Sequence, residues 1–193
     1  MRIQRKIGLF VMLLLLTGCM TAPQPNHIDN ICSIFDEYPS WRQSATQVER
    51  RWGVPTEVLM AIIYQESSFS ADAKPPRTKL LWIIPWKRPS TAYGYSQALK
   101  TTWEDYKRSE NRFWVRRDDF GDAADFIGWY INEAHRVLWI PKNDSYRLYL
   151  AYHEGLHGYR QKTYLNKPWL MNVAKRVQYQ TSQYNRQLMQ CPD

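Results

Sequence analysis

One carboxylate stands out because it lies on the apolar face of a predicted helix. The positions that share this face by i, i+3, i+4, i+7 spacing are Leu59, Ile62, Ile63 and Glu66. Moving a charged carboxylate out of water is costly, so a Glu on such a face tends to keep its proton near neutral pH. A protonated carboxyl in a cleft is the general acid that glycoside cleavage requires. The alternative is a Glu at the edge of the apolar stripe that reaches solvent or an Arg.

A second chemical pattern lies later in the chain, where residues 153–157 have the sequence HEGLH. It matches H-E-x-x-H, in which two His side chains at i and i+4 of a helix bind zinc and the Glu is a base. Such sites usually take a third protein ligand from downstream, but no His or Glu follows His157 and the only later Asp is Asp193. The glycine inside the motif also weakens a helix. A zinc peptidase that uses His153, Glu154 and His157 is therefore the weaker hypothesis, and no metal is expected.

The elements that must position these groups are predicted to be mainly helical. Apolar periodicity and end signals predict helices over residues 40–52, 55–67, 96–108, 118–138, 145–152 and 168–187. Gly53 should end the first of these, Pro55 suits the first position of the second, and Asp144 is a suitable N-cap. No internal repeat and no convincing alternating strand pattern is present.

The start of the chain predicts export. Three basic residues precede an apolar run over residues 7–16, which is too short to span a bilayer and is typical of a signal peptide. The sequence LTGC at residues 16–19 resembles the lipobox of bacterial lipoproteins. That resemblance implies cleavage before Cys19, lipidation of its thiol and a periplasmic chain; Met20, which is not an Asp, implies the outer membrane. An ordinary signal peptide that contains a Cys is the alternative.

The cysteines and the charge fit an exported chain. Of three cysteines, lipidation would use Cys19 and leave Cys32 and Cys191 as a pair in an oxidising compartment. A disulfide would tie the ends of the fold together, whereas two free thiols are the alternative. The net charge of +8 suits anionic polymers in general, but export and the lack of a dense basic block argue against nucleic acid. The predicted organisation is residues 1–18 as signal peptide, 19–31 as lipidated tether and 32–193 as one domain.

Three short motifs follow one another along the chain. They are ESSF at residues 66–69, AYGYSQA at 92–98 and AYHEG at 151–155. In this order they resemble the soluble lytic transglycosylase (SLT) family, whose fold is similar to goose-type lysozyme, over about residues 47–158. The chain departs from the family pattern where Tyr95-Ser96 replaces Leu-Met and His153 replaces Asn.

The resemblance implies a mainly α, lysozyme-like SLT catalytic domain that acts on peptidoglycan glycan strands without a cofactor. The reaction would cleave the β-1,4 bond between N-acetylmuramic acid (MurNAc) and N-acetylglucosamine (GlcNAc) and form 1,6-anhydro-MurNAc, with Glu66 as general acid and then base. One carboxylate suffices because the acetamido group of the substrate stabilises the intermediate. Alternatives are a lysozyme-like muramidase on the same fold and a peptidoglycan-binding lipoprotein that does not cleave.

The same resemblance assigns further site residues. Ser67 would orient Glu66, Gln97 and the backbone of Gly94 would line the groove beside the acetamido group, and Tyr152 would lie near the reacting sugar or Glu66. The substrate-binding residues expected are Ser67, Gly94, Ser96, Gln97, Tyr152 and Glu154.

Residues 74–90 form an unusual insertion between the first two motifs. Four prolines exclude a long helix, and residues 80–84 are too apolar for an idle surface loop. A short strand or a flap is expected, and the alternatives are a loop folded onto the body and a loop that touches the membrane to which Cys19 would tether the domain. Because the segment lies between Glu66 and Gln97, we expect it to border the groove, where Trp82 and Trp86 could stack on sugars.

Overall fold

The computed structural model describes residues 22–76, 79–80, 84–85 and 90–191. The helices are α2 (Ile31–Glu37), α3 (Pro39–Trp52), α4 (Thr56–Ser67), α5 (Lys100–Ser109), α6 (Phe120–Leu138), α7 (Ser145–Arg160) and α8 (Pro168–Leu188). A 3-10 turn, η1 (Thr163–Asn166), precedes α8, and the short strands β1 (Lys79–Leu80) and β2 (Ile84–Pro85) pair antiparallel. The mainly helical fold class expected from the sequence is confirmed.

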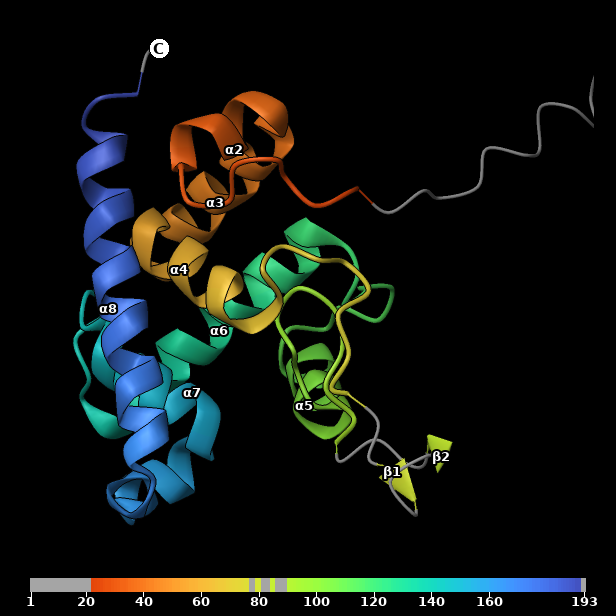
Figure 1. Cartoon of the computed structure of the whole chain (residues 1–193). Helices are drawn as coiled ribbons and strands as arrows, with labels where there is room; N and C mark the ends of the chain where they lie inside the picture. Colours follow the sequence, from red (N-terminus) through yellow and green to blue (C-terminus); the bar gives the residue numbers. More distant parts are fainter. Residues whose placement is uncertain (1–21, 77–78, 81–83, 86–89, 192–193) are drawn as a thin grey trace, which may run out of the picture.

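Helix α4 lies at the centre of the helical body. Every residue from Val58 to Ile63 is buried, so the helix is apolar on all sides and not only along one stripe. It contacts α3, α6, α7 and α8, and Figure 1 shows α8 running along one side of the molecule beside α4 and α7. Glu66 lies in the last turn of this central helix, just beyond its fully buried stretch.

A buried carboxylate ties together three helices around α4. Asp125 of α6 accepts hydrogen bonds from Tyr106 of α5 at 2.6 Å and from the Trp52 indole of α3 at 2.8 Å. Arg51 and Arg112 complete its shell at 2.7 and 2.6 Å. Burial alone would raise the pKa of Asp125, but these hydrogen bonds and charges outweigh it and lower the pKa. The network fixes α6, which supplies one wall of the site.

Several predicted helix ends are confirmed by their caps. Gly53 adopts a left-handed φ of 65° and ends α3. The Asp119 side chain accepts from the backbone N–H of Asp122 at the start of α6, and Asp144 accepts from that of Arg147 at the start of α7.

Helix α5 begins later than predicted, at Lys100 and not at residue 96. Gln97 has a left-handed φ of 47°, and Tyr93 pairs with Ala98 in an isolated β-bridge, so the chain forms a turn before the helix. The elements α2 and η1 were not predicted, because helices of one or two turns carry little periodic signal.

Residues 22–31, the described part of the predicted tether, contact the helical body. The body holds this segment: the Tyr38 hydroxyl donates to the Pro23 carbonyl at 2.9 Å, and the Gln24 amide donates to the Ser68 carbonyl at 2.7 Å. Ile31 is fully buried at the start of α2. The predicted signal peptide at residues 1–18 and Cys19 lie outside the described residues. Within the described ranges, no helix is long and apolar enough to cross a membrane.

A disulfide joins Cys32 in α2 to Cys191 just after α8, with 5.4 Å between the two Cα atoms. The closed loop is long, since 159 positions separate the two residues. Because α8 packs on both α4 and α7, the bridge fastens the helix that supports both sides of the site.

The insertion at residues 74–90 contains the short hairpin, in which Leu80 pairs with Ile84. Figure 1 shows β1 and β2 beyond α5, away from the other helices. Trp82 and Trp86 lie outside the described residues, so their stacking on sugars stays a prediction.

Candidate active site

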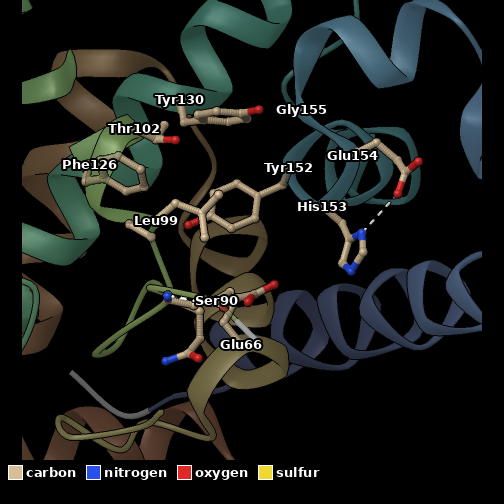
Figure 2. A pocket seen from close by; sticks show the side chains of 13 residues that line it. Glu66, Ser90, Leu99, Thr102, Phe126, Tyr130, Tyr152, His153, Glu154 and Gly155 are labelled. Atoms are coloured by element: carbon tan, nitrogen blue, oxygen red, sulfur yellow. Dashed lines mark hydrogen bonds and ion pairs between the residues drawn. The ribbon is translucent and has the colours of Figure 1, made fainter. Parts of the chain in front are cut away.

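A cavity of about 370 Å³ opens beside Glu66. Its walls come from the end of α4, the chain from Ser90 to Leu99, α5, α6 and the middle of α7. Figure 2 shows Glu66 below Tyr152, with Tyr130 and Phe126 of α6 across from them. Ser90 is the last residue of the 74–90 insertion, so one end of that insertion reaches the cavity.

Glu66 is partly buried and lines this cavity. Burial raises the pKa of its carboxyl to about 7, although a hydrogen bond with Tyr149 acts in the opposite direction. An acid whose pKa lies near the working pH can both give up and take back a proton. The geometry therefore suits Glu66 to general acid and general base chemistry.

Tyr149 is a site residue that none of the sequence motifs indicated. It is 4% exposed in α7, and its hydroxyl forms the hydrogen bond with Glu66. Burial, together with the nearby Glu66 carboxyl, raises the pKa of Tyr149 far above its usual value, so the hydroxyl keeps its proton and can donate it. The available signal was its spacing of three residues from Tyr152, which places both rings on one face of a helix.

Tyr152 forms a wall of the cavity, and its hydroxyl bonds to backbone and not to Glu66. The hydroxyl donates to the Ser96 carbonyl at 2.6 Å. The Tyr152 ring meets the Tyr130 ring edge-on, with 5.1 Å between centroids, and the Tyr130 hydroxyl donates to the Ala151 carbonyl at 3.1 Å. These contacts fix the ring beside the carboxyl of Glu66.

The loop that carries Gly94 and Gln97 is held by its own hydrogen bonds. Gly94 has a left-handed φ of 75°, and a Cβ there would lie 2.0 Å from the Arg117 carbonyl oxygen, so only glycine fits. The Gln97 amide donates to the Gly94 carbonyl at 2.8 Å and to the Ala73 carbonyl at 2.9 Å. Of the predicted loop residues Gln97 lines the cavity, while Gly94 and Ser96 are buried behind it.

The Ser67 hydroxyl bonds within its own helix, because it donates to the Ile63 carbonyl of α4 at 3.2 Å. Its orientation of Glu66 stays a prediction.

Glu154 lines the cavity, but its carboxylate is bound by neighbouring side chains and not by Glu66. Its carboxylate accepts from Lys167 at 2.7 Å, from the Thr163 hydroxyl and from His153 at 3.1 Å. Burial would raise its pKa, but the hydrogen bonds outweigh that effect and lower the pKa. Figure 2 shows the carboxyl turned toward His153 and away from Glu66. The two carboxyls of the cavity thus differ in protonation near neutral pH.

The helical premise of the zinc hypothesis does not hold. Gly155 has φ 74° and ψ 160°, which interrupts α7 between His153 and His157. The two imidazoles therefore lack the i, i+4 relation of a continuous helix. Over the part of the chain that is described, no three His, Cys, Asp or Glu residues gather as potential metal ligands.

Comparison with known proteins identifies the family. A family model described as transglycosylase SLT domain matches residues 7–191, which is nearly the whole chain. No curated protein matches the chain. The family match supports a lysozyme-like all-helical domain and a function of the lytic transglycosylase type that involves peptidoglycan glycan. The chain belongs to the transglycosylase SLT domain family.

Proposed function

We propose that this chain is a peptidoglycan lytic transglycosylase in which Glu66 is the general acid and then the general base. The observation that carries the proposal is the partly buried Glu66 carboxyl in the cavity, with its pKa raised to about 7. The family match supports the choice of substrate.

In the first step Glu66 gives its proton to the glycosidic oxygen between MurNAc and GlcNAc. The acetamido oxygen of MurNAc bonds to C1 as the bond from C1 to the leaving oxygen breaks. In the second step the Glu66 carboxylate takes the proton of the C6 hydroxyl, and O6 bonds to C1 and displaces the acetamido oxygen. The product ends in 1,6-anhydro-MurNAc, Glu66 is protonated again and no water is consumed. Its pKa suits Glu66 to both steps.

Digestion of purified peptidoglycan, followed by mass spectrometry of the released fragments, tests this proposal. Anhydro ends are expected. Reducing ends would indicate a muramidase on the same fold, and binding to the cell wall without release of fragments would indicate a binding protein.

The rate of glycan cleavage should fall as pH rises through about 7. Glu66 must carry its proton before the first step, and it loses that proton above its pKa of about 7. Initial rates measured at low substrate concentration report the pKa of the free enzyme. A falling limb whose midpoint lies near the ordinary value for Glu, about 4.3, would contradict this assignment.

Replacement of Tyr149 by Phe should move that falling limb to higher pH. The Tyr149 hydrogen bond lowers the pKa of Glu66, so its loss raises the pKa further. Tyr152→Phe is the matched control. It removes a hydroxyl from the same face of α7, but this hydroxyl bonds to the Ser96 carbonyl. We expect Tyr152→Phe to slow cleavage with the midpoint in place. Equal midpoints for Tyr149→Phe and the wild type would argue against the proposed contact.

Glu154→Gln should slow cleavage by about tenfold at most, a loss of about 1.4 kcal/mol in transition-state stabilisation. Glu154 bonds to Lys167 and Thr163, so its replacement disturbs one wall of the cavity and not the proton donor. Complete loss of activity at Glu154, together with inhibition by chelators, would instead favour the zinc hypothesis.

We also propose that the chain is exported to the periplasm and held by a lipid at Cys19, at the outer membrane. The apolar run over residues 7–16 and the following LTGC support this, and the Cys32–Cys191 disulfide fits an oxidising compartment. The intact mass of the purified chain tests the anchor, since residues 1–18 should be absent and acyl groups present.

A further inference from the structure

Two adjacent aromatic side chains are exposed in the loop between α5 and α6. Trp114 is 96% exposed and Phe113 is 58% exposed. Large aromatic rings placed together in water commonly mark a surface that meets another molecule. The pair lies outside the set of residues that line the cavity beside Glu66, so the glycan reaction gives it no role.

The arginines that flank this aromatic pair in the sequence are held by partners within the chain. Arg112 pairs with Asp122 and Arg116 pairs with Asp118, each at 3.0 Å. Arg117 donates to the backbone carbonyls of Thr91 and Ala98. The surface therefore offers apolar area beside guanidinium groups that are already bound, which favours contact with an apolar phase over capture of an acidic polymer.

The loop that carries the aromatic pair lies near the start of the described chain, and this position indicates the bilayer as the apolar phase. Ala22, Arg116 and Phe120 line one hollow of about 460 Å³. Figure 1 shows the red end of the described chain on the same side of the molecule as the green loop that leads into α6. Three residue steps separate Ala22 from Cys19, and a chain of that length spans at most about 11 Å. A lipid on Cys19 would hold this face close to the bilayer.

We propose that Phe113 and Trp114 insert into the interfacial layer of the bilayer that carries the Cys19 lipid. Tryptophan is enriched at this depth because its ring is apolar and its N–H is polar. With the lipid as one point of attachment and the aromatic pair as a second, the domain has a fixed orientation on the membrane. This inference rests on the proposed lipid anchor and is independent of the glycan reaction.

Trp139 provides a matched control within the same chain. It is 84% exposed and caps the far end of α6, whereas the aromatic pair precedes the start of that helix. Nineteen residues of α6 separate the two sites, which corresponds to roughly 28 Å along the helix axis. A general effect of removing an exposed Trp would appear at both positions, but membrane insertion should involve Trp114 alone.

The test uses the full acylated chain in vesicles of phosphatidylethanolamine and phosphatidylglycerol whose acyl chains carry bromine, which quenches Trp emission on contact. Wild type, Trp114→Leu and Trp139→Leu are compared with the same proteins in vesicles without bromine. We expect quenching in the wild type and in Trp139→Leu, and loss of most of it in Trp114→Leu. Turnover of soluble glycan should be the same in all three, which also shows that the variants fold.

Equal quenching in the wild type and Trp114→Leu would overturn the inference, as would a loss confined to Trp139→Leu. A chain without acyl groups at Cys19 would overturn it as well. None of these three results bears on the anhydro products formed from soluble glycan, so failure of this inference and failure of the proposed reaction are distinguishable.

Discussion

Glu66→Gln should reduce glycan cleavage at least about a hundredfold, since proton transfer by a positioned side chain contributes about 10² to 10⁴ in rate. Gln keeps the shape of Glu but cannot supply or accept the proton.

The same substitution should affect stability. Folding raises the pKa of Glu66 and so disfavours its ionised form. The free energy of unfolding therefore falls as pH rises from the pKa of the unfolded chain, about 4.3, through the folded value of about 7. Gln removes that loss. The melting temperature of Glu66→Gln should therefore equal or exceed that of the wild type above about pH 7.

Glu57→Gln is the control for this experiment. Glu57 lies in the first turn of the same helix, and burial raises its pKa as well, but it is absent from the lining of the cavity. Both carboxyls are thus affected by burial, but only Glu66 lines the cavity. Full activity of Glu57→Gln beside loss in Glu66→Gln supports the assignment. Retention of more than a few percent of wild-type activity by Glu66→Gln would refute it.

Removal of the disulfide should destabilise the fold by about 5 kcal/mol, the loop-entropy value for so long a loop. For a domain of this size the melting temperature should then fall by roughly 10–20 °C. The double variant Cys32→Ser with Cys191→Ser, measured by calorimetry, tests this. Below its own melting temperature the double variant should still cleave glycan, because neither sulfur lies at the cavity.

Adding a reductant to the wild type should reproduce the lower melting temperature, and adding it to the double variant should change nothing. A double variant that melts within about 1 °C of the wild type would contradict the stabilising role, because that shift corresponds to well under 1 kcal/mol.

The sequence predicted the elements whose signals are local. The caps at Gly53, Asp119 and Asp144 depend on residues within one turn of the helix end, and these helix ends were predicted to within two residues. Glu66 was identifiable for the same reason, since its relation to Leu59, Ile62 and Ile63 lies within a single helix.

The missed features depend on contacts between distant segments. Tyr149 reaches Glu66 only because α7 packs on α4, and no pattern within α7 states that contact. The requirement for glycine at position 94 comes from the Arg117 carbonyl, 23 residues away in the sequence. Glu154 is bound by Lys167 across η1, so the sequence could place it at the site but could not predict its pKa.

The contacts of residues 22–31 with the helical body could not be predicted for a related reason. Its prolines and low apolar content are typical of a tether, but its backbone carbonyls are bound by side chains from the helical body, among them Tyr38 and Tyr184. The composition of a segment reports its own residues. It does not report which side chains from distant parts of the chain will bind its backbone in the fold.

The central claim is that Glu66 cleaves glycan without consuming water, and the most direct test is digestion of purified glycan strands in water labelled with heavy oxygen. The products are then measured by mass spectrometry for the wild type and Glu66→Gln. We predict that the wild type yields fragments that end in 1,6-anhydro-MurNAc without the label, and that Glu66→Gln yields none. Reducing ends that carry heavy oxygen, or anhydro ends formed by Glu66→Gln at the wild-type rate, would contradict the claim.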